Sequence, residues 1–180
     1  MRIIAGKFKG KILSEFELNS TRPTADMVRE ALFDKIGYKT IDAEFLDLFA
    51  GTGAVGIEAL SRGAKNCYFV DESKEAIKII NKNLLSIKAQ NYNILNTSFE
   101  NALTNFKNNS KKFDVIFLDP PYASDFAEHA IQFVYENKLL NPNGIVVWEH
   151  DNLKIPYIEQ NFSNFKTKKY GKKYLTYFDF

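Results

Sequence analysis

The segment Asp47-Leu48-Phe49-Ala50-Gly51-Thr52-Gly53-Ala54-Val55-Gly56 decides the fold class of this chain. It contains the pattern G-x-G-x-x-G at residues 51–56, after an apolar segment that predicts a strand and before a predicted helix. Gly51 and Gly53 carry no side chain, so the backbone can approach a ligand closely. Asp71 follows Gly51 by 20 residues, at the end of the next predicted strand, where its carboxylate can accept hydrogen bonds from ribose hydroxyls. The pattern predicts a nucleoside-binding turn; the alternative is a tight packing turn beside a solvated acid.

Strand-like and helix-like segments alternate from this point to the C-terminus. Predicted strands cover residues 44–49, 66–71, 92–96, 113–118 and 144–148, and predicted helices cover 54–62, 73–89, 99–106 and 124–137. Such alternation indicates an α/β fold with a parallel sheet, right-handed crossovers and helices on both faces. Residues 164–180 predict a β-hairpin, and residues 2–16 predict an N-terminal hairpin that leads into a helix ending near Gly37.

Length and composition favour a single domain over residues 1–180, with an N-terminal hairpin and helix extension at 1–39 and a core at 40–180. No apolar segment reaches membrane-spanning length, and the N-terminus does not resemble a signal peptide. The single cysteine, Cys67, excludes an intramolecular disulfide. The two histidines, His129 and His150, show no metal-ligand spacing. We therefore expect a cytoplasmic protein without a metal site.

A second motif, Asp119-Pro120-Pro121-Tyr122, follows the apolar segment at residues 115–118. A buried strand would deliver Asp119 to the sheet edge, and the two prolines would stiffen the chain as it leaves. The carboxylate and the backbone carbonyls could accept hydrogen bonds from an exocyclic amine, while Tyr122 stacks on the ring that carries it. The structural alternative is a strand end, a Pro-Pro turn and an aromatic neighbour.

Two cofactors fit a glycine-rich turn of this kind: a nicotinamide dinucleotide and S-adenosylmethionine. Asp47, just before the turn, would repel a pyrophosphate. It could instead serve the cationic methionine end of S-adenosylmethionine, directly or through water. No separate segment suggests a hydride-acceptor domain, so the sequence favours S-adenosylmethionine.

Taken together, these motifs resemble the class I S-adenosylmethionine-dependent methyltransferases, and Asp119–Tyr122 is similar to the signature of members that methylate exocyclic amines of nucleobases. The N-terminal segments at residues 2–11, 22–24 and 28–33 look like the bacterial RsmD family, which methylates a guanine N2 in 16S rRNA. The resemblance covers essentially the whole chain. It implies a Rossmann-like, seven-stranded, mostly parallel sheet with the last two strands antiparallel.

The resemblance also implies roles for particular residues. Asp119, Pro120, Pro121 and Tyr122 would be catalytic. The methionine side of the cofactor would be lined by Asp47, Ala50, Gly51 and Gly53. Asp71 would hold the ribose and Glu72 would flank the adenine. Ser98 stands where the family more often has Asp or Asn, and Phe99 could pack on the adenine ring instead.

Basic residues near the N-terminus suggest a surface that contacts RNA, although the net charge of the chain is only +2. The candidates for RNA contact are Arg2, Lys7, Lys9, Arg22 and Arg29; a surface pair between Arg29 and Asp26 or Glu30 is the alternative. The expected partner is 16S rRNA or the assembling 30S subunit, bound by a monomer.

His150 is a possible proton acceptor, with a structural role favoured. Two other functions stay open: an adenine-N6 DNA methyltransferase and a non-catalytic RNA-binding assembly factor.

Overall fold

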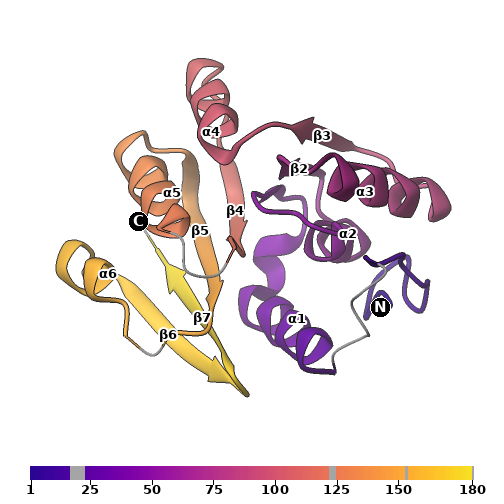
Figure 1. Cartoon of the computed structure of the whole chain (residues 1–180), viewed down its shortest axis with the longest axis horizontal. Helices are drawn as coiled ribbons and strands as arrows, with labels where there is room; N and C mark the ends of the chain where they lie inside the picture. The colour runs from indigo at the N-terminus through magenta and orange to yellow at the C-terminus, as the bar shows by residue number, and fades with distance from the viewer. Residues whose placement is uncertain (17–22, 122–124, 153, 180) are drawn as a thin grey trace.

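The architecture is a seven-stranded sheet between two layers of helices (Figure 1). The computed structural model describes residues 1–16, 23–121, 125–152 and 154–179. The strands are β1 (Glu44–Asp47), β2 (Asn66–Asp71), β3 (Tyr92–Asn96), β4 (Phe113–Leu118), β5 (Leu140–His150), β6 (Phe165–Tyr170) and β7 (Lys173–Phe178). The helices are α1 (Pro23–Ile36), α2 (Ala54–Ser61), α3 (Lys74–Ser86), α4 (Phe99–Asn108), α5 (Phe126–Glu136) and α6 (Pro156–Asn161), with a 3₁₀ turn at Gly37–Thr40.

The strands lie in the order β3-β2-β1-β4-β5-β7-β6. The first five are parallel to one another, and β7 is antiparallel to both β5 and β6. Of the seven strands, β7 alone therefore runs against the others, and β6 points the same way as β5. The expectation of a mostly parallel sheet is confirmed, and the last two strands are antiparallel to each other.

Two apolar cores lie on the two faces of this sheet. Helices α1, α2 and α3 pack on one face, around Phe45, Phe69 and Phe117. Helices α4, α5 and α6 pack on the other, around Leu46, Val70 and Ile116. Alternate residues of one strand thus enter opposite cores, because successive side chains of a strand point to opposite faces. Burial on both sides explains why β4 reads as a nearly continuous apolar run.

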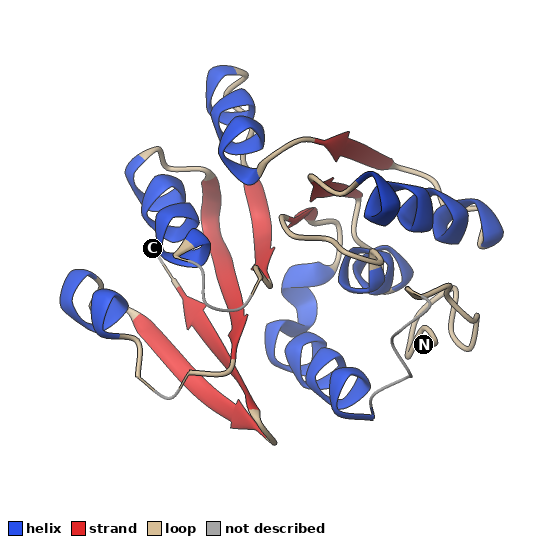
Figure 2. Cartoon of the chain, in the orientation of Figure 1, coloured by secondary structure: helices blue, strands red, loops and turns tan. Residues whose placement is uncertain are grey.

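The prediction of an N-terminal β-hairpin at residues 2–16 is wrong. Residues 1–16 form a loop with one isolated antiparallel bridge, between Arg2 and Ile12, and Figure 2 draws no strand there. Some backbone amides of this loop bond within it, such as Ile3 to the carbonyl of Lys11, and others bond to α2. The carboxylate of Glu58 accepts hydrogen bonds from the amides of Ile4 at 2.8 Å and Ala5 at 2.9 Å. The carbonyl of Ser61 accepts one from the amide of Lys7 at 2.8 Å.

Among the described residues, no helix is long and apolar enough to span a membrane. Within the same ranges, no cluster of three or more His, Cys, Asp or Glu side chains could hold a metal ion.

Candidate active site

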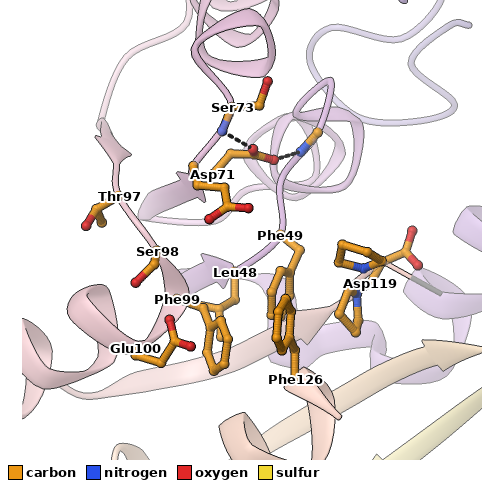
Figure 3. Close-up of a pocket in the computed structure, with 14 residues that line it drawn as sticks. Leu48, Phe49, Asp71, Ser73, Thr97, Ser98, Phe99, Glu100, Asp119 and Phe126 are labelled. Atoms are coloured by element: carbon orange, nitrogen blue, oxygen red, sulfur yellow. Dashed lines mark hydrogen bonds between the residues drawn. The ribbon is translucent and has the colours of Figure 1, made fainter. Parts of the chain in front are cut away.

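The predicted cofactor and catalytic residues follow β1, β2, β3 and β4, which are parallel and end at one edge of the sheet. A cleft of about 550 Å³ opens at this edge (Figure 3). Of the residues predicted from sequence, those that line it are Gly51, Asp71, Glu72, Ser98, Phe99, Asp119, Pro120 and Pro121. Tyr122 lies outside the described residues.

In this cleft, the carboxylate of Asp71 connects the loop that follows β1 with the loop that follows β2. One carboxylate oxygen accepts a hydrogen bond from the amide of Gly51 at 2.8 Å, and the other accepts one from the amide of Ser73 at 2.8 Å (Figure 3). Gly51 has a φ of +55°, which glycine adopts without strain. Each carboxylate oxygen keeps a second lone pair, so Asp71 can also bind a ligand hydroxyl.

Asp47 lies beneath the turn at residues 50–53, called the glycine turn below, and is 1% exposed. Its carboxylate accepts a hydrogen bond from the amide of Gly56 at 2.9 Å. Burial raises the pKa of Asp47 from 3.8 to about 7; the Gly56 hydrogen bond opposes this rise and the charge of Asp71 adds to it. A carboxyl group in this state would gain from a cation placed beside it.

Three aromatic rings form the wall opposite Asp71, and sequence reasoning identified only Phe99. The ring centroids of Phe49 and Phe99 are 5.3 Å apart, and those of Phe99 and Phe126 are 5.1 Å apart. Figure 3 shows the three rings grouped together, with the carboxylate of Asp119 pointing away from them. This wall suits a flat, apolar ring such as a purine. Phe49 belongs to the glycine motif itself, so its position was the signal that could have identified it.

Ser98 begins α4 and caps it. Its hydroxyl accepts a hydrogen bond from the amide of Asn101 at 3.4 Å, so part of its capacity serves the helix. Glu72 is exposed at the rim of the cleft, and its backbone carbonyl accepts a hydrogen bond from the Asn96 amide side chain at 2.9 Å. Both residues line the cleft of about 550 Å³.

A second cavity of about 190 Å³ lies on the other side of the glycine turn. Asp47, Ala50 and Gly51 line it, together with Met1 and residues of α1. It shares Phe49, Gly51 and Asp119 with the larger cleft, so an elongated ligand can occupy both cavities. Gly53 lines neither cavity; with a φ of +78° it starts α2.

Asp119 stands where the two cavities meet. It is exposed to water at the mouth of the cleft, although protein atoms surround it closely. Desolvation and then the nearby charge of Glu149 raise the pKa of Asp119 from 3.8 to about 8, while Lys173 lowers it. Water in the open cleft reduces the cost of charging this carboxyl. Pro120, directly behind it, is buried and fixes the chain.

His150 is not part of this site. Its Nε2 lies 2.7 Å from the hydroxyl of Thr176, and its ring is stacked between Trp148 and Tyr174. Burial lowers the pKa of His150 to about 4. Trp148 belongs to the core under α5, the face opposite Phe117. The structural role that the sequence favoured for His150 matches this position.

The residues predicted to contact RNA have different environments. Arg2, Lys7 and Lys9 are exposed, and Lys7 lies 4.8 Å from the centre of the Phe8 ring. Arg29 is 4% exposed; its guanidinium donates hydrogen bonds to the carbonyl of Arg2 at 2.7 Å and to Asp26 at 3.0 Å. Arg29 thus anchors the N-terminal loop inside the protein. Arg22 lies outside the described residues.

The strand order and the shared edge at which the parallel strands end are those of the class I methyltransferase-like fold. Residues 1–179 match the family model described as "Conserved hypothetical protein 95". The chain belongs to this family, the RsmD/YlbH family of rRNA methyltransferases.

Individual relatives resemble this chain over most of their length. It is 39% identical to YlbH of Bacillus subtilis over 152 residues, which are 84% of this chain and 83% of YlbH. It is 36% identical to "Ribosomal RNA small subunit methyltransferase D" of Haemophilus influenzae, over 95% of this chain and 89% of that protein. The solved structure of a hypothetical protein from Thermus thermophilus superposes with a TM-score of 0.85 at 29% identity, covering 100% of this chain and 99% of that one.

Proposed function

We propose that this protein transfers a methyl group from S-adenosylmethionine to the exocyclic N2 amine of a guanine in 16S rRNA, free or in the assembling 30S subunit. The observation that carries the proposal is the position of Asp119-Pro120-Pro121, at the junction of the two cavities and next to the glycine turn. The relative in Haemophilus influenzae, named for the small-subunit rRNA, supports the choice of RNA.

The two cavities fit the two halves of this cofactor. In the larger cleft, Asp71 would accept hydrogen bonds from the ribose hydroxyls, and the aromatic wall with Glu72 and Ser98 would enclose the adenine. In the smaller cavity, the methionine end would lie along Ala50 and Gly51, above Asp47. The cofactor, when bound, supplies an electrophilic methyl carbon on a positively charged sulfur.

The chain contributes position and charge to the methyl transfer. Asp119 and the carbonyl of Pro120 would accept hydrogen bonds from the two amine protons and so aim the nitrogen lone pair at the methyl carbon. As the new N–C bond forms, the C–S bond breaks with its electron pair going to sulfur, and positive charge develops on the nitrogen. The Asp119 carboxylate stabilises this charge. Its raised pKa suits it to take the proton that the nitrogen then releases. Tyr122 would stack on the unpaired base.

The proposed RNA surface starts at the N-terminal loop, with Arg2, Lys7 and Lys9; Arg22 is a further candidate from the sequence. Arg2 and Lys9 line one hollow of this loop, together with Asp26 and Glu30. Arg29 acts indirectly, by holding the loop through the carbonyl of Arg2.

The test is transfer of radiolabelled methyl groups to 16S rRNA and to 30S particles from a strain that lacks the gene, with duplex DNA in parallel. We expect labelled N2-methylguanosine from RNA or particles. The Asp119→Ala variant should lose at least about 100-fold in kcat, with cofactor affinity by calorimetry within about threefold. Asp34→Asn, an exposed change on α1, is the matched control and should be fully active.

Labelled N6-methyladenine in DNA would replace the proposal with a DNA methyltransferase. Cofactor binding without transfer to any of the three substrates would count against catalysis on nucleic acid. Absence of cofactor binding would favour a non-catalytic assembly factor.

A further inference from the structure

Three ionisable side chains from neighbouring strands gather beside the candidate active site. Asp119 follows β4, Glu149 lies near the end of β5, and Lys173 begins β7. Leu118 is paired with Trp148, so Asp119 and Glu149 are the next residues along two adjacent parallel strands. Because β7 runs in the opposite direction, its first residue lies at the edge where β4 and β5 end.

These side chains share the face of the sheet that carries the glycine turn. Glu149 lines the 190 Å³ cavity with Asp119 and Phe117. It is paired in register with Leu175, two residues after Lys173 and on the same face. The carboxylate of Glu149 lies 3.6 Å from the ammonium of Lys173, and the two side chains are 16% and 18% exposed. The ion pair holds the Glu149 carboxylate in a defined, largely enclosed position.

Two carboxylates side by side discriminate between purines. Adjacent strands lie about 4.8 Å apart, a spacing that lets two carboxylates accept hydrogen bonds from neighbouring donors on one base edge. Guanine presents two such neighbours, the N1–H and the N2 amine. Adenine presents an amine beside an N1 lone pair, which a carboxylate repels. The motif Asp119–Tyr122 explains recognition of an exocyclic amine but not the choice of base. A second carboxylate distinguishes guanine from adenine.

We infer that Glu149 is the specificity-determining residue of this enzyme: its carboxylate accepts a hydrogen bond from N1–H of the target guanine while Asp119 accepts one from the N2 amine. This inference rests on the proposed guanine-N2 methylation. Lys173 positions Glu149 and favours its charged form. Burial raises the pKa of Glu149 and the contact with Lys173 opposes this rise, in agreement with that role.

The competing role for Glu149 is to bind the ammonium of the methionine end of the cofactor, since Asp47 and the glycine turn line the same cavity. The two roles predict different defects. A base-reading carboxylate affects the choice between bases at unchanged cofactor affinity, whereas an ammonium ligand affects cofactor affinity for every base.

The experiment compares 16S rRNA carrying guanine or 2-aminopurine at the position that mass mapping identifies, ligated and assembled into particles where free RNA is not methylated. 2-Aminopurine keeps the N2 amine but has a lone pair at N1. The ratio of kcat/KM for the two RNAs is measured for the wild type and for Glu149→Gln, whose amide can donate a hydrogen bond to that lone pair. Glu159→Gln, an exposed change on α6, is the matched control.

We expect the wild type and Glu159→Gln to prefer guanine by about 100-fold, the upper range for a two-bond base contact. Glu149→Gln should reduce this preference at least about 10-fold, with cofactor affinity by calorimetry unchanged within about twofold. Glu149→Asp keeps the carboxylate on a side chain that is one methylene group shorter. It provides a second test if the glutamine variant does not fold. It should lower kcat/KM for guanine RNA about 10-fold and still reject 2-aminopurine.

An unchanged preference in Glu149→Gln, or unchanged kcat/KM in Glu149→Asp, would overturn the inference. A 10-fold loss of cofactor affinity with the guanine preference intact would assign Glu149 to the methionine end instead. If the wild type forms no N2-methylguanosine at all, the proposed function fails first, and this inference fails with it.

Discussion

The buried carboxyl of Asp47 should make the stability of this protein fall as pH rises through neutrality. Its pKa is raised from 3.8 to about 7 in the folded state, mainly by burial. Between these two values the folded protein binds a proton that the unfolded chain has released. The stabilisation is therefore fully present below about pH 4 and is lost as pH rises through about 7.

The size of the effect follows from the same two values. One pKa unit corresponds to about 1.4 kcal/mol, so a shift of roughly three units corresponds to about 4 kcal/mol. Asp47 is 1% exposed, and water therefore screens it little. This is a large part of the 5–15 kcal/mol, in order of magnitude, that stabilises an average domain.

Asp47→Asn isolates this contribution. The amide does not titrate, and its oxygen can still accept the hydrogen bond from the amide of Gly56. Urea denaturation at a series of pH values should show the variant gaining about 4 kcal/mol relative to the wild type between pH 4 and pH 8. Asp34→Asn, an exposed control, should follow the wild-type profile. If the profiles of Asp47→Asn and the wild type are parallel, Asp47 does not titrate as we describe.

Three further substitutions test the site and its support. Asp71→Ala should weaken binding of S-adenosylmethionine about 10- to 100-fold by calorimetry, because both the proposed ribose acceptor and the anchor of Gly51 are lost; unchanged affinity would contradict the proposed ribose role. Gly56→Ala should reduce the free energy of unfolding by about 1–3 kcal/mol, since the new Cβ would lie 2.4 Å from the Phe69 ring; an unchanged melting temperature would contradict this. Glu58→Ala should reduce the free energy of unfolding by about 3–5 kcal/mol and expose the Ile4 amide to hydrogen exchange. Continued protection of that amide would show that another group holds the N-terminal loop.

The sequence predicted the core of this protein well because its signals are local. The periodicity of the segments predicted β2, β3 and β4 with the observed bounds. Ser73, predicted at the start of a helix, caps α3. The glycine turn and Asp71 were placed together because parallel strands end at one edge.

The N-terminal segment was mispredicted because its partner lies far along the chain. Short β-like segments and two glycines suggested a hairpin, but the amides of Ile4 and Ala5 bond to Glu58, more than 50 residues away. Arg29 was predicted to contact RNA, with a pair to Asp26 as the alternative. The pair with Asp26 forms, and the guanidinium also bonds to the carbonyl of Arg2, 27 residues away, which no local pattern indicates.

The sequence by itself thus determined the α/β class, the glycine turn and the tetrapeptide at the end of β4. Those features depend on neighbours along the chain, which a sequence displays directly. The tertiary structure alone decided that Glu149 and Lys173 stand beside Asp119, and that three phenylalanine rings wall the cleft. Strand order and the reversal of β7 bring these groups together, and both are set by packing between segments that are distant in sequence.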